Sequence, residues 1–558
     1  MSSDLGPLEP IRNEPTEKEC PTCHRELGVR DTFAHKVGFL AGKRTVTEVT
    51  RRCPLHRRRV FHPPPLTPYK SPFAFDLVAE AGRLRFLEQR QLREIAQALH
   101  ERGLPLLGER TVQRLTDRFL LCHAAVHLES LPRLQEALRQ KGGYVLVLDA
   151  TGTPGAMTLV LTDDDDSGGT GWVLLAAPIT DEGPTQVRPH LDRLKRGLGP
   201  PLTGISDQSG GLRDSSREVF PGVYLLLCQF HVLRSIGESL AGKRYRRFHS
   251  EVERSGVKRA LRSLRARLRR AGGKSREARR VLAWVEEVLS WERAAHGRPY
   301  PFFWSALEFY VRSEKVRGEL EAVLHRPGCR AKGAPYLQLK KALDRLRTPT
   351  KRAERLARDF PALQERGRWF ERTRKVLGYR NGPVPLSPKG TLSERGLERG
   401  RLRMDWFEEK IQEELGVKSR SPLMWELHRL LCGVSKKLRA HREELFAPNV
   451  RVRVKGKWVV RHIHRSNGSA ERKFHGLRHT CRRITGDAGR EGQVQREGAG
   501  MLMAGNLKDP GYVRAVYGSL SHLGERFAQV GEAALAEAKL VLARRDDLTS
   551  ERKALRQQ

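Results

Sequence analysis

The order of apolar runs between residues 143 and 240 limits the fold more than any other feature of the chain. The continuous run from Tyr144 to Leu148 is typical of a buried central strand. Residues 158–162 and 172–179 lie on either side of a polar turn and predict two antiparallel strands. The elements expected next are a helix over 189–198, a strand over 202–206, a helix over 211–220, a strand over 224–228 and a helix over 231–240. This order predicts a mixed sheet of five strands covered by helices.

The chain is strongly basic. It has 558 residues, of which 104 are Lys or Arg and 65 are Asp or Glu, so its formal net charge is +39. An excess of this size indicates a polyanionic partner. Nucleic acid is the first candidate, because each phosphate that a protein neutralises releases condensed counterions. The length suggests about three or four domains.

The composition also excludes several classes of protein. Eight cysteines in 558 residues are too few for a disulfide framework, which favours a reducing compartment. No run approaches the roughly 18 apolar residues that span a bilayer. The first 15 residues include acidic side chains and lack the apolar segment of a secretory signal. We therefore expect a cytoplasmic protein, associated with the nucleoid.

Residues 1–62 are predicted to form a zinc-binding module. Two pairs of potential ligands, each with two residues between its members, are separated by 29 residues. The ligands are Cys20, Cys23, Cys53 and His56. This spacing suits a closed, tetrahedral and therefore structural Zn²⁺ site. The alternatives are four unrelated residues, or a site in which His24 or His35 replaces His56.

Residues 73–130 are predicted to form a helix-turn-helix DNA-binding domain after a proline-rich linker. Apolar side chains recur at helical spacing over 92–99 and 111–120, with a turn-rich segment between them. Two such helices are typical of a helix-turn-helix, whose second helix enters the major groove. The side chains expected in the groove are Arg110, Gln113, Arg114 and Arg118. The alternative is an ordinary helical hairpin with a solvated face.

Residues 241–460 are predicted to form a long, basic, helical segment. Its first part, residues 241–280, contains 16 Lys and Arg and 3 Glu, together with an apolar stripe at helical spacing. Like charges at this density repel one another, which favours a helix that faces phosphates over a solvated one. The expected DNA contacts are Arg265, Arg267, Arg269 and Arg270. Residues 491–558 are expected to form a helical C-terminal tail.

Two acidic residues follow apolar runs of the predicted sheet. Asp149 follows the first run and Asp207 follows the run over 202–206. Adjacent strands in this order would hold both carboxylates at one edge of the sheet. Such carboxylates can bind a pair of Mg²⁺ ions that activate a water or a 3′-hydroxyl and stabilise the leaving oxygen.

Glu471 is the best candidate for a third metal ligand. It lies in a segment with apolar residues at helical spacing, with Ser466 or Asn467 as a possible N-cap and Gly486 as a stop. Arg478 follows two turns later on the same face and could contact phosphate. The alternative for Glu471 is an ordinary first-turn glutamate, which the helix dipole favours.

Other candidates have simpler interpretations. The four acids from Asp163 to Asp166 are interpreted as a solvated hairpin turn. Glu182 and Asp214 could support the metal site, although surface acids are ordinary in such segments. His231 could contact the scissile phosphate or orient a carboxylate, or it could be a buried histidine.

Residues 143–237 resemble the DDE transposases of bacterial insertion sequences and their Mutator-like relatives. The strongest similarity is the stretch SDQSGGLRDSSREVFPGVYLLLCQFHVLRSIG, residues 206–237. The resemblance implies an RNase H-like core with Asp149, Asp207 and Glu471 as catalytic metal ligands. It also implies active-site roles for Cys228, His231, Asn467 and Arg478, which match the family's Cys-x-x-His pair, its Asn-x-x-x-Glu pattern and its later basic residue.

The resulting hypothesis is a multidomain α/β plus α protein that acts as a DNA transposase. The predicted domains are residues 1–62 (zinc), 73–130 (helix-turn-helix), 141–240 and 461–490 (catalytic core), 241–460 (helical insertion) and 491–558 (tail). It would use two Mg²⁺ or Mn²⁺ ions and one Zn²⁺ to cleave transposon ends and join them to target DNA, as a homodimer or higher oligomer. The alternatives are an inactive DNA-binding regulator derived from a transposase, and an RNase H-like nuclease.

Overall fold

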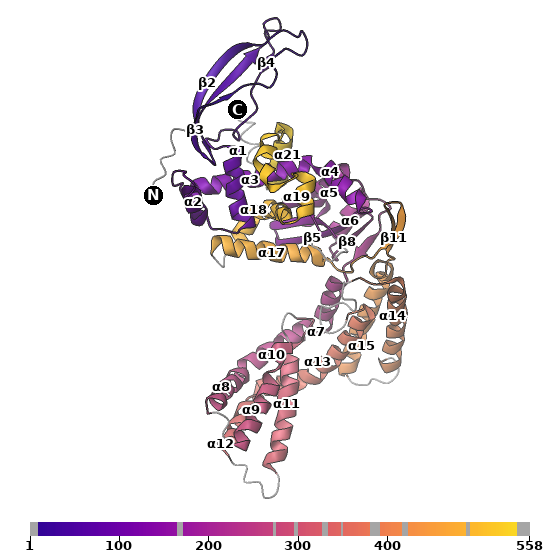
Figure 1. Ribbon diagram of the computed structural model, residues 1–558. Coiled ribbons are helices and arrows are strands. Elements are labelled where there is room, and N and C mark those ends of the chain that lie inside the picture. The colour runs from indigo at the N-terminus through magenta and orange to yellow at the C-terminus, as the bar shows by residue number, and fades with distance from the viewer. Residues whose placement is uncertain are drawn as a thin grey trace. The chain divides into compact units, whose positions relative to one another are not determined.

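A computed structural model of the chain shows a mixed α/β protein that is mostly helical (Figure 1). It describes residues 9–164, 171–271, 275–294, 300–325, 333–347, 350–379, 391–415, 422–486 and 491–543. The chain divides into two compact units. The first contains residues up to Leu226, Val450–Ile463 and the chain from Asn467 onward, and the second contains Leu227–Asn449 and His464–Ser466.

The first unit is built on a five-stranded sheet with the spatial order β7-β6-β5-β8-β9. The strands are β5 (Val145–Thr153), β6 (Ala156–Asp163), β7 (Val173–Ile179), β8 (Thr203–Ser206) and β9 (Leu225–Leu227). Strands β5, β6 and β7 are antiparallel neighbours, whereas β5 and β8 are parallel. Most of their side chains are buried, as expected of a sheet covered on both faces. The mixed sheet predicted from the apolar runs is confirmed in this arrangement.

The helices between the strands follow the predicted order. They are α5 (Pro184–Leu198) and α6 (Gly210–Val219). Helix α5 begins five residues earlier than expected, because Pro184 occupies the first turn, where its missing N–H costs no hydrogen bond. Strand β5 also continues beyond the expected end at Leu148, since it pairs with β6 as far as Thr153.

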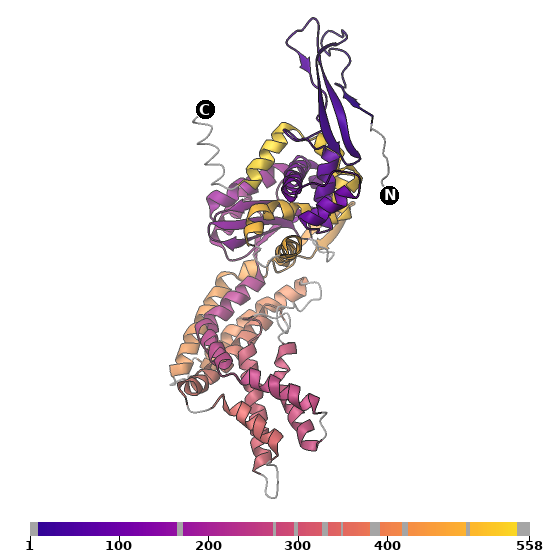
Figure 2. The ribbon, with the colours of Figure 1, turned by 90° about the vertical axis from the view of Figure 1, so that its left-hand side faces the viewer.

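The other helices of the first unit come from both ends of the chain. They are α1 (Phe75–Gly82), η1 (Arg83–Leu87), α2 (Leu92–His100), α3 (Glu109–Glu129), α4 (Leu131–Gln140), α17 (Gly468–Thr485), α18 (Glu491–Ala504), η2 (Gly505–Lys508), α19 (Pro510–Val516), η3 (Leu520–His522), α20 (Leu523–Ala528) and α21 (Glu532–Leu542). Helix α17 packs on β5 and β6, and α18 packs on β6, β7 and α3 (Figures 1 and 2). The segment predicted as a tail therefore helps to cover the sheet.

A four-stranded sheet precedes α1, and its two long strands form a ribbon. Strands β2 (Gly28–Phe39) and β3 (Gly42–Arg52) pair antiparallel, and β1 (Ile11–Asn13) and β4 (Val60–Phe61) both pair with β3. Gly28 lies opposite Arg52 at the open end of the ribbon. The ribbon contains most of the residues between Cys23 and Cys53, and its open end brings the chain after Cys23 close to the chain before Cys53.

A second ribbon replaces part of the segment predicted to be helical. Strands β10 (Val450–Val454) and β11 (Lys457–Arg461) form a hairpin, so the helical prediction is wrong over these residues. Alternating Val and Arg side chains favour a strand, and Lys455 and Gly456 adopt the positive φ angles of a tight hairpin turn. The Arg461 guanidinium donates to the Gly143 and Asp164 carbonyl oxygens, 2.6 and 2.7 Å away, which fixes the hairpin beside β5.

The described part of the second unit is helical, apart from the isolated bridge between Thr391 and His464. Its helices are α7 (Gln229–Arg254), α8 (Val257–Arg270), α9 (Arg276–Leu289), α10 (Trp291–Ala294), α11 (Ser305–Leu324), α12 (Ala334–Asp344), α13 (Lys351–Val376), α14 (Glu394–Leu415), α15 (Pro422–Ala440) and α16 (Arg442–Leu445). They enclose one continuous apolar core, with Trp369, Phe407 and Phe446 fully buried. None of the helices described in either unit has the length and hydropathy needed to cross a membrane.

Candidate functional site

Asp149 and Asp207 lie at the same level of the sheet on neighbouring parallel strands. Val147 of β5 pairs with Ile205 of β8, and each aspartate follows two residues later. Paired strands lie about 4.8 Å apart, so this register brings the two carboxylates to one edge of the sheet. The Asp149 Oδ1 atom accepts a hydrogen bond from the Ala150 N–H, and the Asp207 Oδ1 atom accepts one from the Ser209 N–H.

Helix α17 brings two further predicted residues to this edge. Asn467 stands at the N-cap of α17, as expected, and Gly486 ends the helix with a φ angle of 70°. The Asn467 side chain does not cap the helix. Its Nδ2 atom donates instead to Asp149 Oδ2 at 2.8 Å, in a fully buried contact. Glu471 follows in the first turn and lies close enough to influence the charge of Asp149.

The pKa of Asp149 is affected by the acids around it. Burial raises the pKa of the Asp149 carboxyl well above its ordinary value, and the negative charges of Asp207, Glu471 and Glu182 raise it further. The Ala150 N–H opposes these effects. A buried carboxyl surrounded by like charges favours protonation or a bound cation.

Glu182 is a fourth acid at the site, and the sequence suggested it only as one of two acids that could support the metal. Burial raises its pKa, the Ser209 side chain opposes this through a hydrogen bond, and the charge of Asp207 adds to the increase. A Cβ atom at Gly211 would collide with the Glu182 carbonyl oxygen, so a glycine is needed where α6 approaches this loop. The spacing of Glu182 from Asp207 carries no signal for this contact, because a whole helix lies between them.

Arg478 lies on α17 and contacts strand β5. Its Nη2 atom donates to the Thr151 Oγ1 atom at 2.9 Å in an exposed contact. Thr151 lies two residues after Asp149 on β5. Arg478, which was predicted to contact phosphate, therefore lies near the same part of β5 as Asp149 and is accessible to solvent.

The carboxylates are less tightly gathered than the N-terminal cysteines. Among the described residues, one group of His, Cys, Asp and Glu side chains brings at least three ligand atoms within 4.8 Å of one another, and it contains none of the acids at the sheet edge. The acids thus interact through their charges without forming a closed cage. Their oxygen atoms are nevertheless the donor type that Mg²⁺ and Mn²⁺ prefer.

The group that meets this distance is the predicted zinc site. It consists of Cys20, Cys23, Cys53 and His56. The His56 Nδ1 atom lies 3.7 Å from the Cys20 sulfur and 3.6 Å from the Cys53 sulfur, and the Cys23 and Cys53 sulfurs are 3.5 Å apart. These four residues could hold a metal such as zinc. His24 and His35, the alternative ligands, are not in this group.

Local hydrogen bonds favour the metal-binding form of one of these thiols. Hydrogen bonds from the Thr22 N–H, which has the largest effect, and from the Cys23 N–H and His56 together lower the pKa of Cys20 to about 5, against the effect of burial. A thiolate is the form that binds zinc. Sequence spacing could find this site because the antiparallel ribbon of β2 and β3 joins the two Cys pairs at its open end.

Cys228 and His231 belong to the second unit. Cys228 is buried at the N-cap of α7, and its sulfur lies 3.3 Å from the Nδ1 atom of His231 in the first turn. The Cys-x-x-His pair is therefore a local contact at the start of a helix. The pair is not among the groups of potential metal ligands in the described residues.

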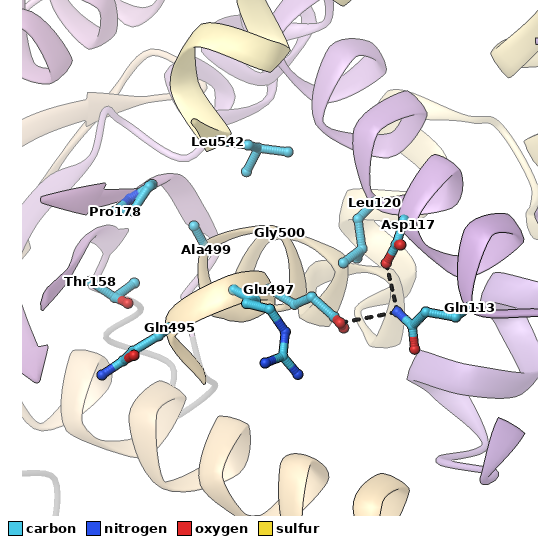
Figure 3. A pocket seen from close by; sticks show the side chains of 11 residues that line it. Gln113, Asp117, Leu120, Thr158, Pro178, Gln495, Glu497, Ala499, Gly500 and Leu542 are labelled. Carbon is cyan, nitrogen blue, oxygen red and sulfur yellow. Dashed lines mark hydrogen bonds between the residues drawn. The ribbon is translucent and has the colours of Figure 1, made fainter. Parts of the chain in front are cut away.

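The predicted DNA-contacting residues of α3 have different environments. Arg110 and Arg114 are exposed, whereas Arg118 donates to the Tyr69 carbonyl oxygen at 3.2 Å. Gln113 is half-buried and has protein partners. Its Nε2 atom donates to Asp117 and to Glu497 of α18, at 2.6 and 3.1 Å, in a pocket inside the first unit (Figure 3). Buried apolar residues continue along this 21-residue helix as far as Leu128, so α3 is longer than the predicted second helix and also contributes to the core.

One of the four arginines predicted to contact DNA from α8 has a carboxylate partner. Arg269 forms an ion pair with Glu286 of α9. Arg262, which lies on the same helix but is not one of the four, pairs with Glu292. Among the described residues, Arg265, Arg267 and Arg270 form no ion pair, and Arg267 and Arg270 are exposed. The apolar stripe that contains Leu261, Leu264 and Leu268 faces the core of the second unit, as the spacing predicts.

The predicted solvated turn at residues 163–166 differs from the structure. Asp163 and Asp164 are buried, and Asp165 and Asp166 lie outside the described residues. The Asp163 carboxylate accepts a hydrogen bond from the Val145 N–H and pairs with Arg461 at 3.5 Å. Burial raises its pKa to about 7, although Arg461 opposes this. Arg461 lies almost 300 residues further along the chain, so local composition could not reveal this pair.

The chain was compared with protein-family models and with curated proteins. No protein-family model matches the chain, and no curated protein matches it significantly.

Proposed function

We propose that the chain is a DDE-type DNA transposase with an RNase H-like core interrupted by a helical insertion. The support from the fold is the strand order, in which three antiparallel strands are followed by two more at the opposite edge. The helical segment between β9 and α17 occupies the position of an insertion between the second aspartate and the glutamate. DNA as the partner is favoured by the net charge of +39.

One observation carries the proposal. Three carboxylates from β5, from the end of β8 and from α17 act on the same buried position, since Asp207 and Glu471 both raise the pKa of Asp149. A fold does not usually place like charges around a buried acid without a compensating cation, and such perturbed acids are enriched at functional sites. Asp149, Asp207 and Glu471 are the residues that would hold the metal ions.

Each residue of the site would then have its own role. When bound, two Mg²⁺ or Mn²⁺ ions supply Lewis-acid activation of the attacking hydroxyl and neutralise charge around the phosphate. Asn467 fixes one oxygen of Asp149 and so orients the carboxylate. Glu182 adds negative charge next to Asp207. Arg478 is positioned on the solvent side to pair with a phosphate oxygen.

The reaction would be an in-line displacement at phosphorus. Water attacks the phosphodiester at an element end, the bond to the 3′-oxygen breaks, and a 3′-hydroxyl is released. That hydroxyl then attacks a phosphodiester of the target strand, whose own 3′-oxygen leaves. Two ends must be processed together, so we propose a homodimer or higher oligomer on DNA.

Incubation of the full chain with labelled DNA tests the proposal. The DNA carries the genomic sequences that flank the coding region, and reactions contain Mg²⁺, Mn²⁺ or a chelator. We expect cleavage and strand joining only with metal, and neither in Asp149→Asn. An exposed acid of the same unit, changed in Asp192→Asn, is the matched control and should keep both activities.

Other outcomes identify the alternatives. Binding to the flanking DNA without cleavage under any metal would indicate an inactive regulator. Metal-dependent cleavage without joining would indicate a nuclease.

A further inference from the structure

A second basic site lies on α17 and is not part of the acid cluster. A cavity of about 320 Å³ opens in the first unit between η1, α17, the end of α18 and η2. This volume is at the lower end of the range of small-ligand sites. The cavity is lined by Arg472, Lys473, His475, His479 and Lys508, and its lining contains no acidic residue.

The charges of this cavity are not neutralised within the described chain. Among the described residues, none of its five basic side chains forms an ion pair. The charge of Asp509 acts on Lys473, but the Asp509 carboxylate accepts a hydrogen bond from the Tyr512 N–H at the start of α19. Three cations and two histidines around one cavity therefore attract an anion.

The cavity also has apolar lining residues. Phe86, Leu477, Met501 and Leu502 line it, and each is almost completely buried. Arginine and lysine side chains suit phosphate, whereas apolar residues suit the flat face of a ring system. A simple inorganic anion would pair with the basic residues and leave the apolar ones without a contact.

We infer that this cavity binds a nucleoside phosphate, with the phosphate at Arg472, Lys473 and Lys508 and the base against the apolar lining residues. The nucleotide could be free or part of a nucleic acid strand, since both present the same chemistry. The inference does not require metal-dependent chemistry at Asp149. It adds to the proposed function a place where α17 would contact nucleic acid on the side of Arg472.

Binding is tested with the full chain in chelator, so that the acid cluster holds no metal. Calorimetric titrations use inorganic phosphate, dAMP and a single-stranded oligonucleotide at equal ionic strength. We expect dAMP to bind at least about tenfold more tightly than inorganic phosphate, which corresponds to about 1.4 kcal/mol. Equal, weak affinities for all three ligands that fall together as salt is added would overturn the inference, because they would show only unspecific screening.

Charge variants locate the binding. Lys508→Gln removes a cation of the cavity that is far in sequence from the acid cluster, and Arg472→Gln removes one from α17. Each should weaken dAMP binding about tenfold or more. Arg483→Gln removes a positive charge from the same helix outside the cavity and should leave the affinity unchanged. An equal loss in all three variants would contradict a site at this cavity.

The two sources of the ligand give different patterns. Tight binding of dAMP that the oligonucleotide does not improve indicates a free nucleotide, and stronger binding of the oligonucleotide indicates a strand path. Either result supports the site even if cleavage by the chain is never observed. Conversely, cleavage that is unchanged in Lys508→Gln, together with no binding of dAMP or oligonucleotide, removes the site and leaves the proposed function intact.

Discussion

Asn467 donates a hydrogen bond to the carboxylate of Asp149 across 318 residues of sequence. The bond joins the N-cap of α17 to the middle of β5, and both side chains are buried. It fixes one oxygen of an acid whose pKa the surrounding charges raise well above its ordinary value. The contact therefore links the position of α17 to the charge of the candidate site.

Asp149→Asn should abolish metal-dependent cleavage and leave DNA affinity within a few-fold, because one metal ligand is lost while the phosphate contacts remain. It should also raise the melting temperature in chelator above about pH 4. A carboxyl whose folded pKa is raised loses stability as the pH increases from its unfolded value near 4 toward the folded value.

Cleavage assays and melting curves from pH 4 to 8 measure both effects. Asp192→Asn should change neither. Cleavage at the normal rate in Asp149→Asn would rule out the metal assignment.

The purified chain should contain about one Zn²⁺ per molecule, and Cys20→Ser combined with Cys53→Ser should remove it, because half of a tetrahedral ligand set is lost. Elemental analysis measures the metal content. Cys432→Ser, which changes a half-buried cysteine of the second unit, is the control and should retain the metal. A metal-free wild-type protein prepared without chelator would contradict the prediction.

Changing Arg265, Arg267, Arg269 and Arg270 to Gln should weaken binding to specific and random DNA alike, because these side chains would meet phosphates. Each lost contact should flatten the slope of log affinity against log salt by about 0.9. Since Arg269 is already paired with Glu286, we expect a change of up to about 2.7 from the three unpaired residues.

A paired control separates this effect from the loss of total charge. Arg262→Gln with Arg269→Gln removes two arginines that already have carboxylate partners and should change the slope little. Identical slopes for the wild type and the quadruple variant would place α8 outside the DNA path.

Acid should destabilise the first unit through two buried histidines. Burial lowers the pKa of His123 to about 3 and of His127 to about 4, where they contact the Tyr517 and Tyr512 hydroxyls. Below about pH 6.5 the unfolded chain binds protons that the folded chain does not. Stability is therefore complete above that pH and falls as the pH decreases toward 4, by about 3 kcal/mol for His127 alone.

Urea unfolding between pH 4 and 8 measures this slope. His127→Gln can hydrogen bond but cannot titrate in this range, so its stability should depend less steeply on pH. An equal slope in the variant would assign the acid sensitivity to other groups.

Local patterns in the sequence predicted those parts of the structure that depend on neighbouring residues. The apolar runs of β5 to β9 and the spacing of Cys20 and Cys53 are of this kind, because strand burial and metal ligation impose short-range rules. The partners of Gln113, Asp163 and Glu182 depend on contacts between distant elements. Nothing within a window of sequence distinguishes a polar residue that faces solvent from one that meets Glu497 across a helix interface.

The same limit applies to the length of α3 and explains the error over the hairpin β10–β11. A basic amphipathic stretch predicted a groove-facing helix, but the apolar face of α3 extends for five turns and is buried by α1, α18 and α21. Composition averaged over residues 241–460 concealed nine residues whose alternation is that of strands. The N-cap position of Asn467 was predictable, whereas the hydrogen bond that its side chain makes was not.

The separation of Asp149 from Asn467 in the sequence also determines when the two residues can meet during synthesis of the chain. Ribosomes add about 5–20 residues per second, so the 318 residues between them take roughly 16 to 64 s to synthesise. Once Asp207 and the helices of the second unit have been made, the nascent chain has both aspartates but still lacks Asn467 and Glu471. It also lacks α17 and α18, which pack on β5, β6 and β7. The sheet therefore remains without part of its cover until the last hundred or so residues have been synthesised, and a product truncated within the second unit would never complete it.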